Sequence, residues 1–246
     1  DKQILELLQN PANLSTEKIN PDAEILLKGY AFFFFFEKIY DEFLTVKDVS
    51  SKTAFFLSDF LNKCATGKDD FYTQSLRIAV SAAKKSNVPL TLQQLKLIYP
   101  QNFSETVEAC AQKYQIPSFI MYALIRSESF FDADVISSAG AIGLTQLMEF
   151  TAGDIARKLR VKNYELTDPA INIEFGTYYL AELLSRTNNS YLHAFMSYNA
   201  GITRVRRWSK KNLNDELFLE IVPYEETREY GRKLISASSI YELLYK

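Results

Sequence analysis

The chain has 246 residues, of which 47% are hydrophobic and 24% are charged, and its formal net charge is −2. This length accommodates one large or two modest domains, and this composition is ordinary for a soluble globular protein rather than a disordered one. The near-neutral charge gives no reason to expect nucleic acid or an anionic membrane as a partner.

Proline and glycine are scarce, at 7 and 8 residues, and apolar residues recur at helical spacing almost throughout the chain. Ser15-Thr16-Glu17 and Ser104-Glu105 have the composition of helix N-caps. Because no long alternating pattern indicates strands, we predict an all-α fold whose first part consists of helix hairpins, with a weak indication of a solenoid. The apolar positions with this spacing are Ile4, Leu5, Leu7, Leu8, Phe55, Phe56, Phe60, Leu61, Leu76, Ile78, Ala79 and Ala82.

The most apolar run is "YAFFFFF", which extends from Tyr30 to Phe36 between Lys28 and Glu37. It is far shorter than the roughly 18 to 20 residues of a membrane helix, and no other segment approaches that length. Five adjacent phenylalanines cover every side of a helix, so we expect this helix to be buried all round in the core. A docking surface for a partner is the alternative.

The two cysteines, Cys64 and Cys110, do not have a spacing typical of a zinc site. They form either one disulfide or two buried thiols, and we favour the thiols. Because the chain begins with Asp1 rather than methionine, we expect any export signal to lie outside this sequence.

A domain boundary is predicted within "LKLIYPQNFSE", residues 95–105. Pro100 ends a helix, and Asn102 to Ser104 can begin the next one. We therefore expect a helical N-terminal domain over residues 1–98 and a second domain over residues 99–246 that holds every chemical motif.

The segment "IPSFIMYALIRSES" predicts a helix that begins at Pro117 and ends near Glu128. A glutamate on its apolar face is partly desolvated, which raises the pKa and allows the acid to donate a proton near neutral pH. The alternative is a solvated glutamate paired with Arg126 or Arg157. The residues that share this face at i, i+3 and i+4 steps are Ile120, Met121, Leu124, Ile125 and Glu128.

Two later segments carry polar groups of a kind found in sugar sites. In "GAIGLTQLM", residues 140–148, glycines allow a tight turn, and Gln146 lies in an apolar run where an amide needs a protein or ligand partner. In "SYNAG", Tyr198 and Asn199 offer a ring face and an amide at a helix end. The alternatives are a core tyrosine at Tyr198 and a simple helix C-cap at Gly201.

The order of these segments resembles the catalytic domain of the soluble lytic transglycosylases, which has a goose-lysozyme-like, mainly helical fold. The resemblance covers roughly residues 99–246, whereas residues 1–98 match little beyond being helical. Five ordered segments make it specific: "IRSESFFDADVISSAGAIGLTQLM", which holds both the Glu-Ser and the Gly-Leu-x-Gln segments, "DPAINIEFGTYYL", "SYNAG" with "RVRRW" behind it, and "VPYEETREY".

This resemblance implies a role for named positions. Glu128 is implied as the single acid and base, and Glu226 borders the groove. Two positions depart from the family: Thr145 stands where a methionine is usual, so groove contacts can differ, and Ser197 replaces a commoner alanine, which is too small a change to threaten activity. The residues that the resemblance places along the sugar site are Ser138, Gln146, Tyr198 and Asn199.

The implied reaction is cleavage of peptidoglycan between N-acetylmuramic acid and N-acetylglucosamine with closure of a 1,6-anhydro ring. Glu128 protonates the glycosidic oxygen and then accepts the proton of the C6 hydroxyl, so no metal or organic cofactor is required. We expect no second catalytic carboxylate, because Asp132 and Asp134 have the character of loop residues. The implied location is the periplasm or cell envelope, where the N-terminal helices could recruit cell-wall proteins.

A basic run contains Arg204, Arg206, Arg207, Lys210 and Lys211. Such a run is usually a solvated helix face; the alternative is attraction toward the lactyl and stem-peptide carboxylates of peptidoglycan.

Three functions remain in competition: a lytic transglycosylase, a lysozyme-type hydrolase on the same fold, and a non-catalytic wall-binding scaffold. His193, the only histidine, has no metal partners in the sequence and no nucleophilic serine motif nearby. We therefore expect it to be structural, and a Ser/His/Asp hydrolase is disfavoured.

Overall fold

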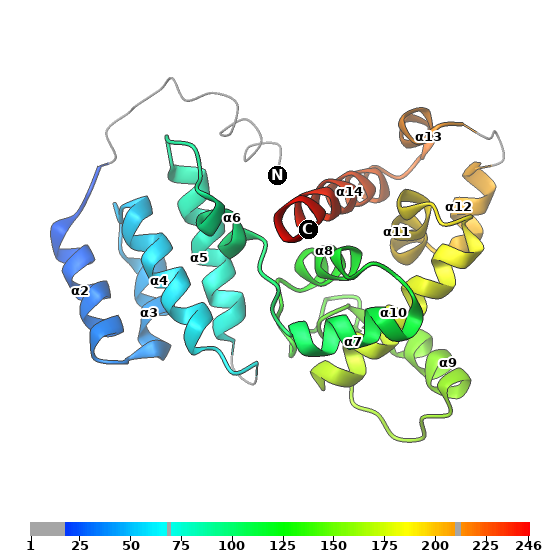
Figure 1. The fold of residues 1–246 in the computed structure, drawn as a ribbon, viewed down its shortest axis with the longest axis horizontal. Helices are drawn as coiled ribbons and strands as arrows, with labels where there is room; N and C mark the ends of the chain where they lie inside the picture. Colours follow the sequence, from blue (N-terminus) through cyan, green and yellow to red (C-terminus); the bar gives the residue numbers. More distant parts are fainter. Residues whose placement is uncertain (1–17, 68–69, 210–212) are drawn as a thin grey trace. The chain divides into compact units, whose positions relative to one another are not determined.

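The structure is a computed structural model that describes residues 18–67, 70–209 and 213–246. Its regular elements are α-helices, apart from a short antiparallel pair formed by β1 (Ala141–Ile142) and β2 (Leu147–Met148) (Figure 1). The expected all-α fold class is confirmed. Some predictions concern residues outside the described ranges: the helix around 4–8, the cap at 15–17, and the last two lysines of the basic run, Lys210 and Lys211.

The described chain divides into two compact units. The N-terminal unit contains the residues up to Asn102 together with Phe130–Asp132. The C-terminal unit contains Phe103–Ser129 and the residues from Ala133 onward. Glu128 and the hairpin of β1 and β2 therefore belong to the C-terminal unit.

Three helices of the N-terminal unit, α2, α4 and α6, begin at a side-chain cap. The side chain of Asn20 accepts hydrogen bonds from the first turn of α2, and Pro21 occupies the first helical position. Ser50 caps α4, and Thr91 forms a capping box with Gln94 at α6. The helices of this unit are α2 (Pro21–Phe32), α3 (Phe36–Thr45), α4 (Ser51–Cys64), α5 (Phe71–Lys85) and α6 (Leu92–Ile98).

The phenylalanine run between α2 and α3 is not a buried helix, so that expectation is wrong. Helix α2 ends at Phe32, α3 begins at Phe36, and Phe34 between them has a left-handed φ of 59°. Phe32 is 75% exposed and Phe34 is 66% exposed. The reason is that α2 buries a single face, formed by Ala23, Leu27 and Ala31 at four-residue steps, and the rings that follow extend beyond it.

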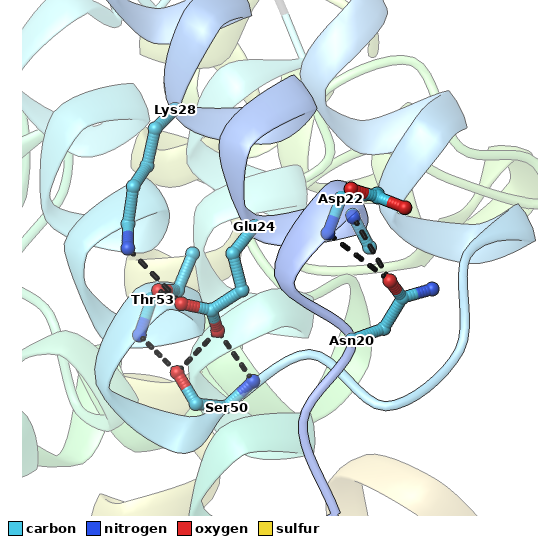
Figure 2. A network of polar contacts seen from close by, with 7 residues as sticks. Asn20, Asp22, Glu24, Lys28, Ser50 and Thr53 are labelled. Carbon is cyan, nitrogen blue, oxygen red and sulfur yellow. Dashed lines mark hydrogen bonds and ion pairs between the residues drawn. The ribbon is translucent and has the colours of Figure 1, made fainter.

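A carboxylate on α2 connects this helix to the start of α4 (Figure 2). Glu24 accepts hydrogen bonds from the backbone and hydroxyl of Ser50, from Thr53 Oγ1 at 2.8 Å and from Lys28 Nζ at 3.0 Å. Partial burial alone would raise the pKa of Glu24, but these hydrogen bonds outweigh it and lower the pKa to about 2. The carboxylate thus stabilises the pairing of α2 with α4.

The C-terminal unit is built around α8, which packs against α7 and α14, while α14 also packs against α11 (Figure 1). Asp168 and Ser190 cap α10 and α11, and Gly201, with a φ of 85°, separates α11 from α12. The helices of this unit are α7 (Ser104–Tyr114), α8 (Ser118–Glu128), α9 (Glu149–Leu159), α10 (Pro169–Arg186), α11 (Tyr191–Ala200), α12 (Ile202–Trp208), α13 (Asp215–Ile221) and α14 (Glu225–Tyr245).

Two expectations from composition concern thiols and membranes. Cys64 and Cys110 are both thiols in the part of the chain that the structure describes, so the disulfide alternative is not realised.

Among the described helices, none combines the length and the apolar character that crossing a bilayer requires.

Candidate active site

Glu128 is the last residue of α8, at the end of a helix face that is otherwise apolar. Its neighbours on that face, Ile120, Leu124 and Ile125 among them, are completely buried. Burial is the largest influence on the carboxyl and raises its pKa to about 7, while a hydrogen bond from Tyr230 and the charge of Lys233 act in the opposite direction. The raised pKa agrees with the prediction made from the apolar helix face.

Tyr230 on α14 donates a hydrogen bond to Oε1 of Glu128. Burial raises the pKa of Tyr230 well above its usual range, and the charge of Glu128 adds to this effect. The phenol therefore stays protonated and remains a donor at physiological pH. Sequence reasoning did not select Tyr230; the available signal was its position four residues after Glu226, on the same face of α14.

A second residue of α14 lies close to the end of α8. Lys233 Nζ donates to the backbone oxygen of Ser127 at 3.2 Å. The pKa of Lys233 is lowered, first by burial and then by the nearby charge of Arg126. The charge of Lys233 in turn limits the rise in the pKa of Glu128, so α14 supplies both groups that oppose the effect of burial.

Tyr198 is placed near Glu128 by α11. Its hydroxyl donates to the backbone oxygen of Thr145 at 2.9 Å, and its ring packs against that of Tyr179 with centroids 5.1 Å apart. Burial raises the pKa of Tyr198 well above its usual range, and the charge of Glu128 raises it further. Tyr198 thus lies within electrostatic range of Glu128 and at the same time holds the loop that precedes Gln146.

Gln146 stabilises the hairpin loop through its side chain. Its backbone has a φ of 50°, and its Nε2 donates to the backbone oxygens of Gly143 at 3.0 Å and Val135 at 3.2 Å. The partner that we expected for this amide is therefore protein. Its side-chain nitrogen thus fixes the shape of the hairpin loop.

Asn172 on α10 holds the same loop from the buried side. Its Nδ2 donates to the backbone oxygens of Ile142 and Leu166 at 2.9 and 2.7 Å, and its Oδ1 accepts from Thr145. A Cβ atom at Gly143, where φ is 75°, would lie 2.3 Å from both Asn172 Nδ2 and the Leu166 oxygen. Only glycine fits there. Sequence reasoning missed Asn172, whose signal was a lone amide in an apolar stretch of helix.

The side chain of Thr145 is completely buried. Its Oγ1 donates to Asn172 Oδ1 at 2.7 Å and packs tightly against Gly176. We expected a threonine at this position to alter contacts within the groove. The Thr145 side chain faces α10 and supports the loop from inside, so any effect on the groove would be indirect and stays a prediction.

The other sugar-site candidates are surface residues of the C-terminal unit. Ser138 is exposed in the turn between Ser137 and Gly140. Asn199 is exposed and accepts a hydrogen bond from Thr227 Oγ1 at 2.8 Å, and Glu226 is exposed beside Thr227 in the first turn of α14. Among the described residues, no hydrogen bond or ion pair connects Ser138 or Glu226 to Glu128.

Across the described residues, no group of three or more histidine, cysteine, aspartate or glutamate side chains is placed to hold a metal ion. His193 stacks on Phe218 with ring centroids 4.1 Å apart, and its Nδ1 is 2.8 Å from Ser190 Oγ. These contacts hold the imidazole of α11 against α13.

The geometry around Glu128 suits proton transfer: burial raises the pKa of its carboxyl to about 7, and the phenol of Tyr230 donates to one of its oxygens. Tyr198, within electrostatic range of Glu128, holds the glycine-bearing loop. Residues 105–218 match the model of the family described as Transglycosylase SLT domain. These residues form a transglycosylase SLT domain. The SLT domain contains Glu128, the hairpin loop and Tyr198, whereas Tyr230 lies on α14 beyond the matched range.

Relatives of known name agree with this assignment. The soluble lytic murein transglycosylase of Escherichia coli strain K12 is 30% identical over 150 residues, which cover 58% of this chain and 23% of that protein. The membrane-bound lytic murein transglycosylase C of Yersinia enterocolitica is 29% identical over 165 residues, which cover 55% of this chain and 45% of that protein. The chain thus spans less than half the length of each relative.

A solved structure extends the similarity of fold beyond the SLT domain. The lytic transglycosylase Slt of Pseudomonas aeruginosa, solved as an inactive mutant, has a TM-score of 0.73 and 24% sequence identity. The comparison covers 97% of this chain and 38% of that one. It therefore includes helices of the N-terminal unit, which the family model does not cover.

Proposed function

We propose that this protein is a peptidoglycan lytic transglycosylase with Glu128 as its single catalytic acid and base. The observation that carries the proposal is the Glu128 carboxyl, whose pKa burial raises to about 7 at the end of an apolar helix. About half of such carboxyls are protonated near neutral pH, which is the state required of a general acid. Support comes from the SLT domain that surrounds Glu128 and from the names of its relatives.

In the first step, Glu128 donates its proton to the oxygen that joins N-acetylmuramic acid to N-acetylglucosamine. The bond between that oxygen and C1 of the muramic acid breaks, and N-acetylglucosamine leaves with a new hydroxyl. The acetamido group of the substrate stabilises the positive charge that develops at C1. No second carboxylate is needed for this role, in contrast to glycosidases that use a pair of them.

In the second step, the C6 hydroxyl of the same muramic acid attacks C1. Glu128, now a carboxylate, accepts the proton of that hydroxyl, and a 1,6-anhydro ring forms. The proton that Glu128 gave up is thereby restored, and no water is consumed. Because the hydrogen bond from Tyr230 occupies Oε1, we assign the proton transfers to Oε2.

Neighbouring residues position the glycan in this proposal. Tyr198 offers its ring to a sugar near Glu128, and the loop that Gln146 shapes forms the adjacent wall. Asn199 is held in place by Thr227 and contributes amide contacts. Ser138 and Glu226, both exposed, contact the glycan farther from the bond that breaks.

The proposed site of action is the cell envelope, because peptidoglycan is found there. Recruitment of cell-wall proteins by the N-terminal helices stays a prediction, and the helices of the N-terminal unit are the segment to test in binding experiments.

Digestion of isolated sacculi followed by mass spectrometry tests the activity. A lytic transglycosylase releases 1,6-anhydromuropeptides even in water enriched in ¹⁸O, and their masses carry no label. A lysozyme-type hydrolase instead releases reducing ends that contain ¹⁸O. Unlabelled anhydro products support the proposal, and labelled reducing ends as the sole products overturn it in favour of hydrolysis.

Two variants separate catalysis from a scaffold role. Glu128→Gln keeps the shape of the side chain but removes the acid, and we expect product formation to fall by roughly 10²- to 10⁴-fold. Glu105→Gln, an exposed change in the first turn of α7, is the matched control and should retain activity. If Glu128→Gln leaves the effect on the wall unchanged, the protein acts as a non-catalytic scaffold.

A further inference from the structure

A cavity of about 340 Å³ lies in the C-terminal unit, at the end of α10 and among α11, α12 and α13. This volume is within the range of small-ligand pockets. None of the residues assigned above to proton transfer or sugar contacts lines it. We call it the α12 cavity; the lining residues used below are Arg186, His193, Val205, Arg206, Trp208 and Phe218.

Part of the lining of the α12 cavity is apolar. Val205 and Phe218 are buried, and the ring of His193 stacks on Phe218. Burial lowers the pKa of His193, although the nearby charge of Asp215 acts against this, so the imidazole is neutral at neutral pH. These side chains can contact a small apolar group, and the neutral imidazole adds no positive charge.

Two residues of the cavity lining each carry a polar atom without a hydrogen-bond partner in the part of the chain that the structure describes. The indole N–H of Trp208 and the Nε2 atom of His193 take part in no hydrogen bond among the described residues. Polar groups that line a pocket are the ones that orient a ligand. A ligand with both acceptor and donor groups would satisfy both atoms.

Charges of both signs lie around the cavity. Arg206 Nη2 donates to the backbone oxygen of Arg186 at 3.2 Å, which fixes the guanidinium against the wall. Arg186 pairs with Glu182 at 3.3 Å, whereas Arg206 forms no ion pair with a carboxylate in the described ranges. Asp215 lies near His193, with 3.8 Å between its Oδ1 and Nδ1 of the imidazole. Arg206 thus remains available for an anionic group, and Asp215 for a cationic one.

We propose that the α12 cavity binds a short peptide that carries both a carboxylate and an ammonium group. The carboxylate pairs with Arg206, because a guanidinium matches a carboxylate with two parallel hydrogen bonds. The ammonium group pairs with Asp215, and a small apolar side chain contacts Val205 and Phe218. If the proposed function holds, on which this identification of the ligand rests, the peptide is the stem peptide of peptidoglycan.

Tryptophan fluorescence tests this directly, because Trp208 is the only tryptophan of the chain. The probe is a synthetic stem tetrapeptide with a free side-chain amino group and free carboxylates, titrated into the full chain without any glycan. We expect a saturable change in fluorescence. The same peptide with its carboxylates amidated should bind at least tenfold more weakly.

Two substitutions on α12 complete the test. Arg206→Gln should weaken binding at least tenfold. Arg207→Gln removes the same charge from the adjacent exposed position, which does not line the cavity, and should change binding less than twofold. Thermal melts of both variants exclude a difference caused by unfolding.

No saturable change, or equal losses for Arg206→Gln and Arg207→Gln, would overturn the proposal. Equal losses indicate only general electrostatic attraction by the helix. The same titration with Glu128→Gln keeps the two proposals separate. We expect Glu128→Gln to bind the peptide like the wild-type protein, because Glu128 does not line the cavity. If the wild-type protein binds the peptide but releases no anhydro products, the proposed function is refuted and the cavity remains a peptide site. If the wild-type protein releases anhydro products but does not bind the peptide, only the proposal for the cavity is refuted.

Discussion

The phenol of Tyr230 donates a hydrogen bond to Oε1 of Glu128, a residue 102 positions earlier in the chain. This contact favours the charged carboxylate and opposes the effect of burial, which favours the neutral acid. The pKa of about 7 at Glu128 is therefore the balance of two structural effects, supplied by α8 and α14.

Tyr230→Phe removes the hydrogen bond that lowers the pKa of Glu128 and leaves the effect of burial in place. Without the hydroxyl, the pKa of Glu128 should rise by about one unit, given the usual strength of hydrogen bonds to charged groups. The alkaline limb of the pH profile for sacculus solubilisation should move to higher pH by the same amount. Tyr224→Phe, a change of an exposed residue at the start of α14, is the control. An unshifted alkaline limb in Tyr230→Phe would show that the contact does not tune the acid.

Glu128 should make the protein less stable as pH rises. Its folded pKa of about 7 lies above the value of 4.5 for an unperturbed glutamate, so the folded state binds more protons between these two values. The free energy of unfolding should fall across this interval, by up to about 3 kcal/mol for a shift of this size. Glu128→Gln has no titrating group at this position and should therefore lack this part of the pH dependence.

Thermal unfolding at pH 5 and pH 8 measures this effect. The wild-type protein should lose more stability between the two pH values than Glu128→Gln, which should be the more stable of the two at pH 8. Parallel pH dependence in both proteins would mean that Glu128 titrates normally in the folded state.

Glu24 should show the opposite pH dependence in the N-terminal unit. Its folded pKa of about 2 lies below 4.5, so its contribution to stability is present above pH 4.5 and is lost as pH falls toward 2. At neutral pH, Glu24→Gln should lower the free energy of unfolding by about 2 kcal/mol, as expected for hydrogen bonds to a charged group. Urea unfolding measures this loss of stability. Glu37→Gln, a change of an exposed residue, is the control and should lower the free energy of unfolding by less than about 0.5 kcal/mol.

Gly143→Ala tests how the hairpin loop is packed. The added methyl group would collide with Asn172 and the Leu166 oxygen, in a backbone conformation that already disfavours alanine. We expect a loss of about 2–4 kcal/mol in the free energy of unfolding, with lower activity.

Gly140→Ala is the matched control for Gly143→Ala. Gly140 has a φ of 85°, yet a Cβ atom there would meet nothing within 4 Å. Gly140→Ala should therefore lower the free energy of unfolding by only about 1–2 kcal/mol, because alanine is disfavoured in the left-handed conformation. Equal losses for the two variants would show that backbone conformation, rather than contact with Asn172, explains the requirement for glycine.

Local patterns were sufficient to predict the elements that depend on nearby residues. The helix that ends at Glu128 follows from apolar residues three and four positions apart, and Pro117 lies directly before its first residue, one position from the predicted start. The raised pKa of Glu128 follows from the same periodicity, because burial of that face is its largest cause.

Features that depend on packing between distant segments could not be predicted. Tyr230 reaches Glu128 only because α14 packs along α8, and Asn172 reaches Thr145 only because α10 lies behind the hairpin loop. The prediction that the phenylalanine run is buried was wrong for the same reason. Whether Phe32 is buried depends on which helices surround it, and a single-sequence pattern does not contain that information.

Titration of the Glu128 carboxyl by NMR tests the central claim most directly. Glutamate Cδ atoms labelled with ¹³C report each carboxyl separately, and the signal missing in Glu128→Gln identifies the residue. The structure predicts a midpoint near pH 7 for that signal. A midpoint near 4.5 would contradict the account, because a normally ionised Glu128 could not supply the proton that cleavage requires at neutral pH.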